Sequence, residues 1–71
     1  MYHYYLTQRP PSIGTYPREG VVAVEAYDGK KVVADIGRMA WGKVTYAEPL
    51  TERQVYDFEL TPSPKNRKGK Q

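Results

Sequence analysis

Apolar and polar residues are distributed along this chain in a pattern that predicts four extended segments. Residues 2–7 are dominated by aromatic side chains, while 21–27 and 31–36 consist largely of Val and Ala. A fourth segment, 40–47, contains Gly42, and a glycine inside a strand commonly marks a bulge or the close approach of another element. β-Branched and aromatic residues fit a half-buried pleated surface, so all four segments are expected to be strands.

The two Val-rich segments are expected to form a hairpin. Each has an alternating apolar face, made of Val22, Val24 and Ala26 in the first and of Val32, Ala34 and Ile36 in the second. Pairing these faces requires an odd number of loop residues, which Asp28-Gly29-Lys30 supplies, or a bulge that absorbs one residue. The apolar face that begins at Val22 is then the one that a helix should cover.

The clearest local signal is a short helix that begins after Leu50. Thr51 is a good N-cap, and Gln54 stands at the third helical position, which completes a capping box. Leu50 and Val55 occupy the positions of a hydrophobic staple, and Val55 and Phe58 are spaced to face the sheet. A helix of about two turns does not persist alone in water, so packing must hold it.

These elements predict one α+β domain over residues 1–60, with an antiparallel sheet of three to four strands and one short C-terminal helix packed on one face. The chain has 71 residues and a net charge of +3. The whole positive surplus lies in residues 61–71, which contain four basic residues, no acidic residue and two prolines. This tail is expected to be disordered because it has no apolar side chain to bury.

Composition excludes several kinds of chemistry. The chain has no Cys and one His, which removes disulfides, thiolate metal sites, Cys nucleophiles and His-rich metal clusters. No grouping of nucleophile, base and orienting residue is present, so we expect neither an enzyme nor a cofactor. The sequence has no apolar run of the roughly 20 residues that a membrane helix needs and no signal-peptide pattern. We therefore expect a soluble cytoplasmic protein.

The aromatic residues are the best candidates for a binding surface. Strand alternation places Tyr27 and Trp41 on the face opposite the helix, where Tyr5 can join them, with Arg9 at the edge. Such a face can anchor a protein partner or stack unpaired bases. The alternative, which we favour, is that the proline-rich loop after the first strand partly covers this face, with Tyr16 packed on it. A small protein needs its aromatic residues to build a core.

Two blocks of sequence carry a resemblance to a known family. The string YYLTQRPPSIGTYP, residues 4–17, resembles the opening of small bacterial proteins related to defence against restriction A. The later block of residues 49–60, with its PLT start and EL end, is similar to the same proteins. The resemblance implies a mobile-element protein that helps phage or plasmid DNA to escape restriction. It transfers no catalytic residue.

The sequence favours a non-enzymatic accessory protein, associated with a phage or mobile element, that acts by protein–protein contact. The expected contact residues are Tyr5, Arg9, Tyr27 and Trp41. The alternative is weak binding of single-stranded nucleic acid or an anti-restriction activity, in which the aromatic face stacks bases and the tail contacts phosphates. The expected phosphate contacts are Lys65, Arg67, Lys68 and Lys70. The sequence fixes neither the partner nor the oligomeric state.

Overall fold

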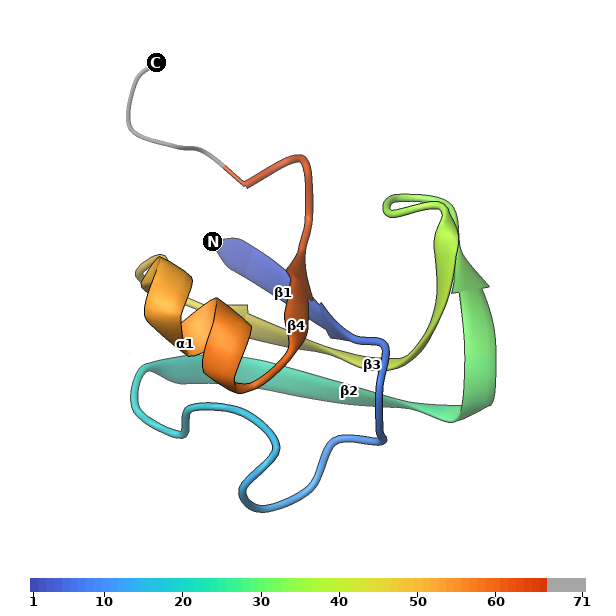
Figure 1. Cartoon of the computed structure of the whole chain (residues 1–71), viewed down its shortest axis with the longest axis horizontal. Helices are drawn as coiled ribbons and strands as arrows, with labels where there is room; N and C mark the ends of the chain where they lie inside the picture. The colour runs from blue at the N-terminus through green and yellow to red at the C-terminus, as the bar shows by residue number, and fades with distance from the viewer. Residues whose placement is uncertain (67–71) are drawn as a thin grey trace.

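The computed structural model describes residues 1–66 of the chain. Its elements are β1 (Tyr2–Leu6), β2 (Val21–Val33), β3 (Arg38–Tyr46), α1 (Glu52–Asp57) and β4 (Leu60–Pro62). The strands form one antiparallel sheet in the order β2-β3-β1-β4 (Figure 1). This architecture confirms the predicted α+β class. Within residues 1–66, no helix is both long enough and apolar enough to cross a membrane.

The larger core cluster lies between the sheet and α1. Its buried members come from three strands: Tyr4, Leu6, Val44, Tyr46 and Leu60. Residues flanking and within α1, together with side chains from the loop between β1 and β2, pack against this cluster. The two tyrosine rings meet edge to face with centroids 5.7 Å apart, and the Tyr46 hydroxyl donates a hydrogen bond of 2.6 Å to the Pro17 carbonyl. This hydrogen bond satisfies the only polar group of a deeply buried ring.

A second, smaller cluster lies on the opposite face of the sheet. It contains Tyr5, Val33 and Ala40, with Tyr27 and Ile36 packed against them. Val33, Ile36 and Ala40 belong to the far end of the β2–β3 hairpin, which curls over the face that carries Tyr5 (Figure 1). The curled hairpin therefore provides a cover for this face, and α1 provides one for the other.

The predicted helix start is confirmed. The Thr51 hydroxyl accepts a hydrogen bond of 3.0 Å from the Gln54 amide, and the Gln54 side chain accepts one of 2.9 Å from the Thr51 amide. Val55 and Phe58 pack against the larger cluster as expected. The helix spans only six residues because the chain turns at Glu59, whose φ is 54°, and then enters β4.

The predicted hairpin loop at residues 28–30 is wrong. β2 runs without interruption through these residues, and the chain turns instead at residues 34–37, where Gly37 adopts a φ of 66°. In the β2–β3 pairing, Ala26 is opposite Gly42 and Lys31 is opposite Ala40, so four residues of β2 face a single residue of β3. The Asp-Gly pair thus forms a bulge, because a bulge also accepts a glycine with positive φ.

The predicted helix-covered face is also wrong. Val22, Val24 and Val32 remain 52%, 43% and 69% exposed. The reason is the strand order, since β2 is an edge strand whose partner within residues 1–66 is β3. The short helix lies beside β4 and packs against the larger core cluster, whose residues come from β1, β3 and β4.

The expectation of disorder from residue 61 onward is wrong for residues 61–66. Leu60–Pro62 form β4, which pairs with β1, and both Ser63 and Asn66 are buried. The Asn66 side chain accepts a hydrogen bond of 2.7 Å from the His3 amide and donates one of 2.9 Å to the His3 carbonyl. These polar side chains order the segment through backbone hydrogen bonds, which a search for apolar residues does not detect.

Gly42 marks the close approach of another element, as the sequence indicated. A Cβ added there would overlap the Pro11 ring and would lie 2.5 Å from the Glu25 carbonyl oxygen. Pro11 belongs to the loop between β1 and β2, and Glu25 belongs to β2. The absence of a side chain at residue 42 therefore lets the proline-rich loop cross the sheet on the α1 side.

We expect Gly42→Ala to destabilise the protein by about 1–3 kcal/mol, because the added methyl group would push the Pro11 ring and the Glu25 backbone away from residue 42. The Glu25 oxygen is part of the β2–β3 ladder and has little freedom to move. Thermal unfolding followed by circular dichroism measures the effect. A melting temperature equal to that of the unchanged protein would contradict the close approach of Pro11.

Candidate functional site

The predicted aromatic surface is not an open patch. Tyr5 is only 7% exposed and belongs to the smaller core cluster, against which Tyr27 packs. Trp41 is half-buried. The side chains that cover this face come from the end of the β2–β3 hairpin, whereas Tyr16 packs on the α1 side. The prediction that the proline-rich loop covers the aromatic face is therefore wrong in its choice of element.

Two lysines lie over the half-buried rings. The Lys31 ammonium is 4.7 Å from the centre of the Tyr27 ring, and that of Lys30 is 5.8 Å from the Trp41 ring. The fourth predicted contact residue, Arg9, forms an ion pair of 2.6 Å with Glu59. Both partners of that pair are about half exposed, and ion pairs at such positions contribute little to stability.

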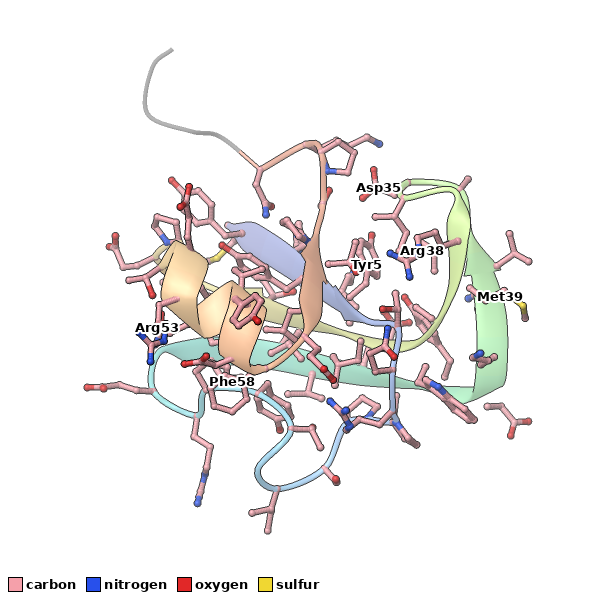
Figure 2. All side chains as sticks on the ribbon, viewed as in Figure 1. Tyr5, Asp35, Arg38, Met39, Arg53 and Phe58 are labelled. Atoms are coloured by element: carbon pink, nitrogen blue, oxygen red, sulfur yellow. The ribbon has the colours of Figure 1, made fainter. Side chains whose placement is uncertain are left out.

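Asp35 fastens the hairpin end to the rest of the fold. Its carboxylate accepts hydrogen bonds from the Tyr5 hydroxyl at 2.9 Å and from the Ser63 hydroxyl at 2.5 Å. Figure 2 shows Asp35 at the hairpin end, close to Tyr5. One side chain therefore links the turn between β2 and β3, the interior strand β1 and the segment that follows β4.

Titration of this region follows from its hydrogen bonds and burial. The Ser63 hydroxyl, more than that of Tyr5, holds the pKa of Asp35 below its usual value. Burial and the bond to Asp35 raise the pKa of Tyr5 to about 12. Burial, with a smaller effect from Lys43, lowers the pKa of His3. At neutral pH this region thus holds an ionised Asp35 and a neutral Tyr5.

A groove of about 800 Å³ runs beside β4, the edge strand opposite β2. Its apolar side chains come from β1, α1 and the segments flanking the helix, and they include Tyr2, Leu50, Val55 and Leu60. Its charged side chains are Arg38, Glu52, Asp57 and Glu59. Tyr56 lines the groove with 80% of its surface exposed.

The groove has the features of a binding surface. The apolar side chains of its lining supply area for burial. The charges around them are largely balanced, because Arg9 pairs with Glu59 at 2.6 Å and Arg53 pairs with Asp57 at 3.0 Å. In the part of the chain that the structure describes, no three His, Asp or Glu side chains come together as a metal site would require. The arrangement suits the docking of a chain that carries apolar side chains.

Sequence reasoning identified only some of these residues. It placed Leu50 and Val55 at the start of the helix, but it had no signal for a groove, since two of the three residues of β4 belong to the segment that was expected to be disordered. It did not single out Asp35, although the position of this residue in a turn with Gly37 could have suggested a fixed contact. Of the predicted phosphate contacts, Lys65 is exposed. The other three, Arg67, Lys68 and Lys70, lie outside the described residues.

Comparison with known families now adds to the geometry. The family model described as "Defence against restriction A C-terminal" matches residues 1–65. The chain belongs to this family. The match ends within the segment that follows β4, so the family domain includes the edge strand and the buried Ser63. No match was found among curated proteins or solved structures.

The Asp35 contacts predict a pH dependence of stability. Because the pKa of Asp35 is lower in the folded protein than in the unfolded chain, its contribution is present above the unfolded value of 3.8 and is lost as pH falls through the folded pKa. Asp35→Asn should therefore reduce the unfolding free energy at pH 7, and this difference should shrink as the pH falls below about 4. Urea unfolding between pH 2 and pH 7 measures both proteins.

Tyr5→Phe serves as the control, because it keeps the buried ring and removes only one donor to Asp35. Its loss of stability should be smaller than that of the Asn variant, since the Ser63 bond remains. A difference between the unchanged protein and Asp35→Asn that stays constant over the whole pH range would contradict the role given to this carboxylate.

Proposed function

We propose that this member of the restriction-defence family is a non-enzymatic accessory protein that acts by binding a protein partner in the groove beside β4. The observation that carries the proposal is the combination, in one open groove, of an apolar lining and the exposed Tyr56 ring. Exposed aromatic side chains beside apolar pockets are frequent energetic centres of protein interfaces.

The proposal differs from the sequence-based one in the surface that it uses. Tyr5 is buried in the smaller core cluster, and the Arg9 guanidinium is paired with Glu59 of the groove lining. Tyr27 and Trp41 lie beneath lysines on the β2–β3 hairpin. The groove, by contrast, is built from β1, α1 and β4, and its lining is open.

The lining of the groove favours one class of partner. Its carboxylates are largely balanced, since Glu59 pairs with Arg9 and Asp57 pairs with Arg53, and Arg38 also lines the groove. Apolar side chains therefore offer the main source of binding energy, and a peptide segment that presents apolar side chains would match them. A phosphate backbone would find no positive surplus in this lining, so the groove suits a peptide better than nucleic acid.

Substitution of Tyr56 by Ala tests the groove. Because the ring is 80% exposed, its removal should leave the fold intact. The affinity for the partner should fall by roughly 10-fold or more, as it does when an aromatic residue at the centre of an interface is removed. The partner is first captured from the native host with the unchanged chain, and its affinity for each variant is then measured by calorimetry. Ile13→Ala is the matched control, because Ile13 is 87% exposed and lies outside the groove.

The same variants are tested in a protection assay. This assay counts how often the mobile element is established in a host that restricts its DNA. Tyr56→Ala should lose protection together with partner binding, and Ile13→Ala should retain both. Equal binding by the two variants would contradict the groove. Binding of single-stranded DNA or RNA at physiological salt, with loss on Trp41→Ala, would instead favour the nucleic-acid alternative, in which the lysine-covered rings stack bases.

A further inference from the structure

The outer edge of β2 lacks a hydrogen-bonded neighbour among residues 1–66. β2 lies at one end of the sheet and pairs with β3. It is also the longest strand of the protein, with 13 residues. A free edge of this kind exposes backbone N–H and C=O groups that can pair with another strand.

Residues 23–26 of β2 carry little of the protection that natural edge strands use. The pairing of β2 with β3 is irregular between Val21 and Ala23 and becomes regular from Ala23 to Ala26. This regular stretch contains one charged residue and no proline. Val22 and Val24 are 52% and 43% exposed, and the flanking Ala23 and Ala26 are exposed as well. Edge strands that avoid association normally carry lysine, proline, bulges or inward-pointing charges, so residues 23–26 are the part of β2 suited to pairing.

The second half of β2 is protected in the expected way. It contains the bulge between Ala26 and Lys31, the charged Asp28, and two lysines that lie over Tyr27 and Trp41. A bulge bends the strand and interrupts its ladder. Pairing with another strand is therefore confined to residues 23–26, which lie between the two irregularities of β2.

We propose that this segment pairs with the same segment of a second copy of the chain, antiparallel about a twofold axis through Val24. In this register Val24 faces Val24 of the other copy, and Ala23 faces Glu25. The two exposed valines thus meet each other, and the only charged residue of the segment meets an alanine. An interface that is its own complement in this way suits a twofold dimer.

Neighbouring registers are less favourable. Centring the pairing on Glu25 places two carboxylates directly opposite each other, and like charges in that position destabilise a strand pair. Centring it on Ala23 places Glu25 opposite Val21, which packs against the larger core cluster. Charge and burial together therefore select the pairing centred on Val24.

The dimer would have a continuous eight-stranded sheet, with two copies of the four-stranded order joined at β2. A contact of a few residue pairs is smaller than the roughly 1,200 Å² of stable interfaces, so the association belongs to the weak, reversible class. The groove beside β4 lies at the opposite edge of each sheet and stays open. Dimerisation would thus present two grooves, and it does not depend on what they bind.

A single introduced thiol tests the register, because the chain contains no cysteine. Directly opposed residues of antiparallel strands have Cα atoms about 4.5–5.5 Å apart, within the range of a disulfide, about 4.4–6.8 Å. Val24→Cys should therefore form a disulfide-linked dimer rapidly under mild oxidation. Val22→Cys is the matched control, since its two copies would be four residues apart along the strands, about 13 Å, and should cross-link at least 10-fold more slowly.

Sedimentation of the unchanged full-length chain supplies the second readout. Its average mass should rise toward twice the monomer mass as the concentration approaches about 100 µM, the range in which weak interfaces associate. The proposal requires both results. A chain that remains monomeric at that concentration, or cross-linking at residue 22 as fast as at residue 24, overturns it, while failure of the Tyr56 experiment leaves it unaffected.

Discussion

The interior position of β1 is the constraint on which the rest of the structure depends. This five-residue strand pairs with β3 on one side and with β4 on the other. Its alternate side chains enter opposite layers, because Tyr4 and Leu6 belong to the cluster under α1 and Tyr5 belongs to the cluster under the hairpin end. This one short strand therefore contributes side chains to both core clusters and links β3 to β4.

Residues 63–66 are held against β1 in this arrangement. The His3 carbonyl accepts hydrogen bonds from the Ser63 amide at 3.0 Å and from the Asn66 side chain at 2.9 Å. Ser63 also donates to Asp35, which fixes the hairpin end at the same place. The groove exists because β4 is held here, with α1 packed next to it. The candidate site is thus a consequence of the contacts between β1 and residues 60–66.

Features set by neighbouring residues could be predicted from the sequence, while those set by distant pairing could not. The capping box at Thr51 and Gln54 is a local signal, and the structure has both of its hydrogen bonds. The Asp28-Gly29 pair is equally compatible with a turn and with a bulge, and only pairing with β3 decides between them.

Burial of the C-terminal segment was missed for a related reason. Asn66 is 8% exposed and Ser63 is 3% exposed, yet both are polar and lie in a stretch that has the composition of a disordered tail. Their order comes from hydrogen bonds to β1 and Asp35, more than 20 residues away along the chain. Tyr5 was predicted on the correct face, but its cover, the curled hairpin, depends on the bulge that the sequence did not reveal.

Native-state hydrogen exchange tests the central role of β1 most directly, because it reports the opening of individual backbone amides. The amides of His3 and Ser63 donate to Asn66 and to the His3 carbonyl. They should exchange about as slowly as the amides that pair β1 with β3. Exchange of both at the rate of an unstructured peptide, with the β1–β3 amides still protected, would contradict the closure of the sheet by β4.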